Sequence, residues 1–135
     1  MTKHSTKHGV TFLLIILVIL MLTACNKVDA GAPGYTQISQ SEAKEMMEKD
    51  DGHVIVDVRR EDEYNAGHIP GAIRVTNEDI GDTMPEELPD LDQIILVYCR
   101  SGRRSKEAAE KLAKIGYTNV YEFGGIIDWD GEVVK

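Results

Sequence analysis

Cys99 stands at a place in this 135-residue chain where a sulfur atom would be activated as a nucleophile. The apolar, β-branched run 93–98 is typical of a buried strand and leads directly to it, and Ser105–Ile115 has the apolar spacing of a helix. Unpaired N–H groups at a helix N-terminus stabilise an anion. We therefore expect Cys99 to be an ionised, solvent-open sulfur that attacks a substrate. The candidate site is completed by Arg100, Ser101, Gly102, Arg103, Arg104 and Ser105.

Each residue type in this segment suits the binding of an anion. Gly102 allows the backbone to curl so that successive N–H groups point inward. The guanidinium groups of Arg100, Arg103 and Arg104 are expected to bind an anionic substrate, and Ser105 is placed to cap the helix. Because the chain carries a net charge of −8, three arginines beside one cysteine indicate a site rather than a solvated basic face.

Two chemistries use a cysteine thiolate surrounded by backbone amides: sulfur transfer and phosphate-ester hydrolysis. Cysteine-dependent phosphatases have the pattern Cys-x5-Arg, in which the arginine binds two phosphate oxygens. Counted from Cys99, that position is Ser105, and the nearest arginine comes one place early at Arg104. The spacing therefore favours sulfur transfer, with a phosphatase as the weaker alternative.

The segment Cys-Arg-Ser-Gly-Arg-Arg-Ser resembles the active-site loop of single-domain rhodaneses, which corresponds here to Cys99–Arg104. Further matches to the family extend over about residues 36–130. Ile126-Ile127 departs from the family pattern, because many members carry a tryptophan or another bulky residue directly after a glycine pair. The other matching segments are Asp57–Arg59, Glu63-Tyr64, Gly67–Ala72 and Gly124-Gly125 followed by Trp129.

The resemblance implies a sulfurtransferase. Cys99 would take the outer sulfur of a small anionic donor such as thiosulfate, and would carry it as a persulfide stabilised by the amides of residues 101–105. A thiol, cyanide or a protein cysteine would then accept the sulfur. We expect a monomer and no cofactor. The alternative within the family is a domain that carries persulfide or binds a protein without turnover.

Three other residues of the matching segments have structural interpretations. Asp57 and Arg59 are predicted to form an ion pair or to support the active-site loop from behind. His68 lies between a glycine and an Ile-Pro turn, and we expect its side chain to hold that turn by a hydrogen bond. Because no Cys/His pair has ligand spacing, no metal site is predicted.

Strand and helix patterns alternate along the chain and predict an α/β fold with a mainly parallel central sheet and helices on both faces. The resemblance implies that this fold is a rhodanese-like three-layer domain. Ser39 followed by Glu42 has capping-box spacing for a first helix. Ligands of such sheets bind at the carboxyl ends of strands, where Cys99 is placed. The expected strands are 35–38, 54–58, 73–75, 93–98 and 120–123. The expected helices are one that begins after residue 39, two that cover 61–66 and 105–115, and a last short one near Trp129.

The N-terminal residues have the pattern of an export signal. Lys3 and Lys7 precede an apolar run, 10–22, that is shorter than the roughly 20 residues a membrane-spanning helix needs. Leu22–Cys25 resembles the bacterial lipobox, which implies cleavage before Cys25 and its lipidation. A short uncleaved anchor helix is the alternative. The predicted organisation is a lipoprotein signal peptide at 1–24, a lipidated N-terminus and flexible tether at 25–34, and a rhodanese-like domain at 35–135.

This organisation places the domain at the extracytoplasmic face of a bacterial membrane, held there through its lipid anchor. Residues 1–24 carry two of the 15 basic residues and none of the 23 acidic ones, which leaves 13 basic residues against 23 acidic ones after cleavage. So acidic a body disfavours nucleic acid as a partner. It also indicates that membrane contact depends on the lipid and not on the protein surface.

Overall fold

The structure is a computed structural model that describes residues 34–135. The predicted signal peptide, Cys25 and all but the last residue of the predicted tether lie outside the described residues. No helix in the described part is long and apolar enough to cross a membrane.

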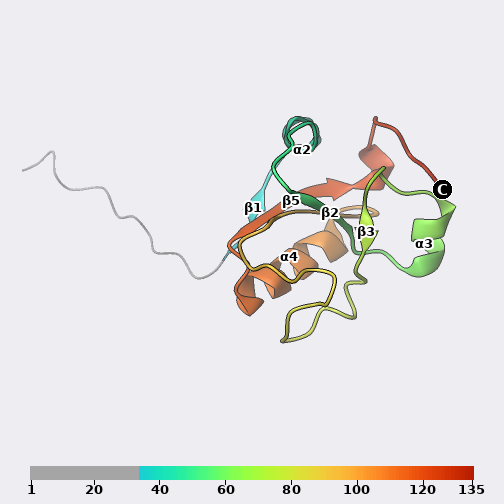
Figure 1. Ribbon diagram of the computed structural model, residues 1–135. Coiled ribbons are helices and arrows are strands. Elements are labelled where there is room, and N and C mark those ends of the chain that lie inside the picture. Colours follow the sequence, from blue (N-terminus) through green and yellow to red (C-terminus); the bar gives the residue numbers. More distant parts are fainter. Residues whose placement is uncertain (1–33) are drawn as a thin grey trace, which may run out of the picture. The chain divides into compact units, whose positions relative to one another are not determined.

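A five-stranded sheet forms the centre of the domain, with the strand order β1-β5-β4-β2-β3 and every neighbouring pair parallel (Figure 1). Parallel strands covered on both faces are apolar on both faces, which explains why the chain has runs such as VIV at 54–56 and IILVY at 94–98. The strands are β1 (Thr36–Gln37), β2 (Val54–Asp57), β3 (Ile73–Arg74), β4 (Ile94–Cys99) and β5 (Asn119–Gly125).

Helices cover both faces of the sheet, as the sequence predicted. In Figure 1, α4 lies on one side of the strands and α2 on the other. The buried side chains accordingly form two clusters, one that includes Leu112 of α4 and one that includes Ala43 of α2. The helices are α2 (Gln40–Met47), α3 (Glu61–Ala66), α4 (Arg103–Ile115) and a short 3-10 helix η1 (Ile126–Asp128).

The predicted capping box opens α2. Ser39 is the N-cap residue: the Glu42 backbone N–H donates to Ser39 Oγ over 3.2 Å, and the Ser39 backbone N–H donates to Glu42 Oε2 over 2.7 Å. These reciprocal bonds satisfy two of the donors that a helix start leaves unpaired. The same contacts lower the pKa of Glu42, chiefly through the bond from the Ser39 backbone.

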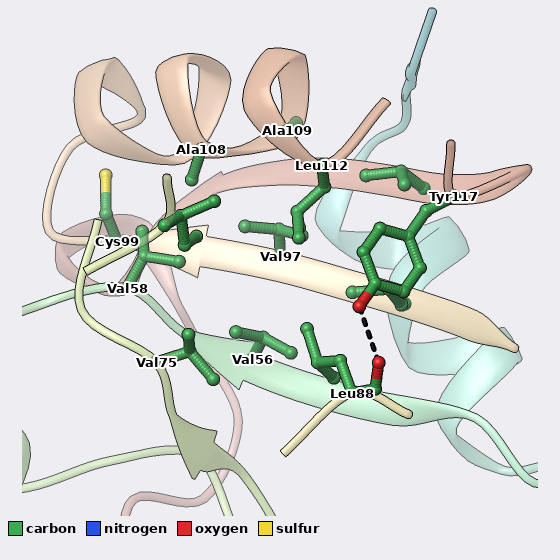
Figure 2. Packing of buried hydrophobic residues seen from close by; sticks show 13 residues of the cluster. Val56, Val58, Val75, Leu88, Val97, Cys99, Ala108, Ala109, Leu112 and Tyr117 are labelled. Carbon is green, nitrogen blue, oxygen red and sulfur yellow. Dashed lines mark hydrogen bonds between the residues drawn. The ribbon is translucent and has the colours of Figure 1, made fainter. Parts of the chain in front are cut away.

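The layer between α4 and the sheet is a continuous apolar core (Figure 2). Val97 and Leu112 are fully buried in it, and the hydroxyl of Tyr117 donates to the Leu88 carbonyl at the end of the core away from Cys99. Cys99 closes the opposite end of this layer, directly beneath the start of α4. The core therefore fixes the distance between the end of β4 and the helix N-terminus.

Two element boundaries differ from the prediction in a way that matters for the site. β4 extends through Cys99, and α4 begins at Arg103, two residues earlier than expected. The N-cap is Gly102, whose φ of 98° is in the left-handed region that favours glycine. The prediction that Ser105 caps the helix is therefore wrong, because Ser105 already lies within its first turn.

Candidate active site

The sulfur of Cys99 lies beneath the first turn of α4. The Gly102 N–H donates to Sγ over 3.0 Å, and the thiol faces Ser105 Oγ at 3.4 Å. Cys99 is the last residue of β4, and its side chain projects to the α4 side of the sheet (Figure 2). The residue is only 1% exposed, so the expectation of a solvent-open sulfur is wrong. The loop and the helix start cover the atom that they were predicted to display.

The short loop over Cys99 fits closely against Gly125 at the end of β5. A Cβ atom on Gly125 would come within 2.2 Å of the Arg100 carbonyl oxygen and 2.5 Å of Ser101 Cα. The Ile127 N–H, just beyond, donates to the same Arg100 carbonyl over 3.2 Å. The glycine pair that resembled a family motif thus has a steric reason in this chain: the second glycine makes room for the loop.

Arg104 is bound to a carboxylate rather than left free for a substrate. Its two terminal nitrogens donate to the two oxygens of Glu63 over 2.7 and 2.8 Å, in a bidentate pair between α4 and α3. The hydrogen bonds from Arg104 lower the pKa of Glu63 to about 2, against an opposing effect of burial. The sequence prediction that Arg104 binds the substrate missed this partner.

Arg100 and Arg103 remain available to an anion. Both are exposed, and the nearest carboxylate to Arg103 is Glu107 at 3.7 Å, a loose contact across one helical turn. Together with Ser101 they line a pocket of about 430 Å³ beside the loop. The pocket is completed by Arg60, Asp62, Glu63, Glu78 and Arg104. The pocket contains acidic and basic groups, and within it the guanidinium groups of Arg100 and Arg103 can bind a small anion.

A buried carboxylate that the sequence analysis did not single out lies behind the loop. Glu122 of β5 is fully buried, and its Oε1 accepts bonds from the Ser105 hydroxyl over 2.6 Å and the Gly124 N–H over 2.9 Å. Glu122 pairs in register with Val97, so its side chain points to the α4 side of the sheet, as Cys99 does. An acidic residue inside the apolar run 120–123 was the signal that could have revealed it.

Asp57 and Arg59 form a buried ion pair. The Arg59 Nε donates to both oxygens of Asp57 over 2.9 and 3.0 Å, and Nη2 adds a bond of 2.6 Å. Burial opposes the charge of Arg59, but the bonds and charge of Asp57 outweigh it and raise the pKa of the guanidinium. Nη2 also reaches the Gly67 carbonyl over 2.7 Å. The pair therefore holds the segment after α3, and its contacts do not include the active-site loop.

His68 lies in the same segment, directly after Gly67. Its ring stacks on Tyr64 with 3.8 Å between centroids, and Nδ1 lies 3.0 Å from the Tyr64 carbonyl. Its backbone exchanges two hydrogen bonds with Val134, which ties the chain end to the domain. The described residues include no group of three or more potential ligands placed to hold a metal ion.

The fold and site together define a class: a doubly covered parallel sheet in which a cysteine at a strand end meets a helix N-terminus through a short, arginine-bearing loop. Residues 39–132 match the family model described as "Rhodanese-like domain". The chain belongs to the rhodanese-like domain family.

Relatives and solved structures agree with that assignment. The chain is 36% identical over 97 residues to thiosulfate sulfurtransferase GlpE of Pseudoalteromonas translucida, a match that covers 71% of this chain and 90% of the relative. It is 33% identical to the putative sulfur carrier protein YrkF of Bacillus subtilis, over 75% of this chain and 54% of that protein. A solved structure, "rhodanese with anions from E. coli", superposes with a TM-score of 0.55 at 33% identity, over 62% of this chain and 98% of the other. The first relative is named for sulfur transfer and the second for carrying sulfur.

Proposed function

We propose that this domain transfers the outer sulfur of thiosulfate, or of a similar anionic donor, through a persulfide on Cys99. In the first half-reaction, the Cys99 thiol loses its proton to solvent, Sγ forms a bond to the outer sulfur, and the sulfur–sulfur bond of the donor breaks. Its electron pair leaves with sulfite. In the second half-reaction, a nucleophile such as cyanide takes the outer sulfur as thiocyanate, and Cys99 becomes free again.

The observation that carries this proposal is the position of Sγ under the start of α4. The Gly102 N–H already donates to Sγ, and the first N–H groups of a helix have no partners within the helix. These groups and the positive end of the helix dipole stabilise the extra negative charge of a persulfide. Because the residue is 1% exposed, we expect the loop to shift when a donor enters.

Arg100 and Arg103 supply the charge for the sulfonate part of the donor. Both guanidinium groups face solvent at the pocket beside the loop, where a doubly charged donor arrives and sulfite departs. Arg104 has a different role in this proposal. Its pair with Glu63 joins the first turn of α4 to α3, so it positions the loop instead of binding the donor.

The same pair argues against a phosphatase. A phosphatase loop needs an arginine that binds two phosphate oxygens, and Arg104 uses that bidentate geometry on Glu63. A domain that carries persulfide without turnover is the remaining alternative, and the similarity to a protein named a putative sulfur carrier supports it. The two differ in whether the persulfide passes to an acceptor more than once per domain.

Thiocyanate formation from thiosulfate and cyanide tests the proposal directly. We expect multiple turnovers in the unmodified protein and none in Cys99→Ser, with Ser41→Ala, at an exposed serine of α2 outside the site, as the control that keeps the nucleophile. Intact mass after thiosulfate treatment should show one added sulfur that Cys99→Ser lacks. Full activity in Cys99→Ser would reject the proposal, and one added sulfur without turnover would assign the domain as a carrier.

We also propose that Cys25 is lipidated and anchors the domain outside the cytoplasm. The support is the sequence alone: a basic start, an apolar run and the Leu-Thr-Ala-Cys segment. Stable attachment by acyl chains needs more than one chain. In a bacterial host, the unmodified protein should sediment with membranes and incorporate labelled palmitate, and Cys25→Ser should do neither.

A further inference from the structure

Glu122 has an unusual environment for a buried carboxylate. Its Oε1 accepts two hydrogen bonds, from Ser105 and Gly124, while Oε2 is buried without a hydrogen-bond partner among the described residues. Both donors are neutral. A buried polar oxygen without a protein partner costs free energy, so its environment calls for a specific explanation.

Ser105 connects this carboxylate to the nucleophile. Its hydroxyl has a single proton, and the Glu122 oxygen at 2.6 Å is the nearest acceptor, closer than the Gly102 carbonyl at 3.0 Å. With that proton directed to Glu122, Ser105 Oγ presents a lone pair to the sulfur 3.4 Å away. A lone pair accepts a bond from an S–H group and repels a sulfur anion.

We propose that Glu122, acting through Ser105, holds the resting Cys99 as a neutral thiol and so sets the pH above which the site accepts sulfur. Two effects act in the same direction. In this proposal Glu122 is a carboxylate anion, whose charge opposes a second charge on Sγ in a buried region, and the orientation of the Ser105 hydroxyl favours the protonated sulfur. This inference rests on the proposed sulfur chemistry for its purpose. Glu122 is a positioning residue and not a catalytic one, because it acts on the sulfur through Ser105.

Other charged groups near the pair do not cancel this effect. Arg104 is the cation that interacts with Cys99, and its charge is shared with Glu63 in the bidentate pair. Tyr35 packs against the same core cluster as Cys99, close enough to Glu122 for its charge to act on the phenol. Burial, Glu122 and Glu110 together raise the pKa of Tyr35, so it remains a neutral phenol near neutral pH. Gly102 opposes the effect of Glu122, because its N–H favours charge on Sγ.

The test compares Glu122→Gln with Glu110→Gln in the full chain carrying Cys25→Ser, so that Cys99 is the sole thiol. The amide is close in size to the carboxylate, and it removes the charge. Glu110 is an exposed carboxylate on α4, so its substitution changes net charge equally without touching Ser105. The rate of alkylation by iodoacetamide is measured from acidic to alkaline pH, together with the ultraviolet absorbance of the thiolate relative to Cys99→Ser.

In Glu122→Gln we expect both profiles to move to lower pH by about one unit, which is about a tenfold faster alkylation at a fixed acidic pH. Glu110→Gln should match the parent. Profiles that stay in place would overturn the proposal. A move to higher pH would overturn it as well, since it would identify Glu122 as a group that assists ionisation.

Ser105→Ala provides a second variant if the amide disturbs folding, which circular dichroism monitors. It removes the lone pair that faces the sulfur and leaves the carboxylate, so we expect a smaller shift in the same direction. An unchanged Ser105→Ala profile would contradict the link through the hydroxyl. None of these measurements uses a sulfur donor. Failure of thiocyanate formation in the parent would therefore reject the proposed function without affecting this result.

Discussion

The two buried carboxylates of this domain, Asp57 and Glu122, lie on opposite faces of the same sheet and have opposite surroundings. Asp57 receives bonds from the guanidinium and the backbone N–H of Arg59, so its charge is balanced. Glu122 receives two bonds from neutral donors and has one oxygen without a partner among the described residues. The first arrangement fastens the segment after α3, whereas the second lies one hydroxyl away from the nucleophile. The paired carboxylate of Asp57 stabilises the fold, and the unpaired carboxylate of Glu122 is the one that we propose acts on Cys99.

The largest effect should come from breaking the balanced pair. In Asp57→Asn, the Arg59 guanidinium loses its counter-charge while it stays buried. Removing one partner of a buried pair typically costs about 3–5 kcal/mol, so we expect a loss of that size in the free energy of unfolding. Urea unfolding followed by circular dichroism measures it. Replacing Asp62, an exposed carboxylate in the next turn of chain, with Asn is the control and should change little. An Asp57→Asn protein as stable as the control would show that the Asp57–Arg59 pair does not stabilise the fold.

The second largest effect should come from Gly125, which leaves room for the loop that follows Cys99. Gly125→Ala places a methyl group 2.2 Å from a backbone oxygen, which neither segment can relieve without moving. We expect a loss of roughly 2–3 kcal/mol in stability from overpacking, and a larger proportional loss in thiocyanate formation because the loop over Cys99 is displaced. Gly81→Ala is the control, since its Cβ has no neighbour within 4 Å. Equal activity of the two variants would show that the loop tolerates displacement.

The Glu63–Arg104 pair adds a third, partly buried carboxylate whose effect depends on pH. The pKa of Glu63 is lowered from an ordinary value near 4.5 to about 2, so its contribution to stability is fully present above pH 4.5 and is lost as the pH falls through 2. The stability difference between the unmodified protein and Glu63→Gln should therefore shrink across that interval. Urea midpoints at a series of acidic pH values measure it, and a constant difference would contradict the ion pair.

The smallest effect on stability should come from Glu122→Gln, which sharpens the contrast with Asp57→Asn. Loss of a buried charge that no cation balances removes a desolvation cost, so we expect Glu122→Gln to be as stable as the unmodified protein or more stable. The same urea titration measures it, alongside the shift in Cys99 reactivity. Strong destabilisation by Glu122→Gln would mean that both carboxylates serve the fold, and the comparison would fail.

Much of the fold was predictable because its cues are local. The run 54–58 marked β2, the Ser39 and Glu42 spacing marked the start of α2, and Gly116 ended α4 as expected. The start of α4 was misplaced because a serine is a common N-cap, while the turn here depends on the left-handed conformation of Gly102. The resemblance to rhodaneses led to Cys99 and its loop, and the structure then separated Arg104 from Arg100 and Arg103 by their partners.

The sequence by itself indicated the candidate nucleophile, the parallel sheet and the loop that joins β4 to α4, since each follows from neighbouring residues and local geometry. The tertiary structure alone decided which charges meet. Glu63 and Arg104 are separated by 41 positions, and Ser105 and Glu122 by 17. Whether a charge is paired, or buried without a cation, depends on distances across the sheet and between helices. That is why burial of the sulfur and its carboxylate neighbour could not be seen in the order of the residues.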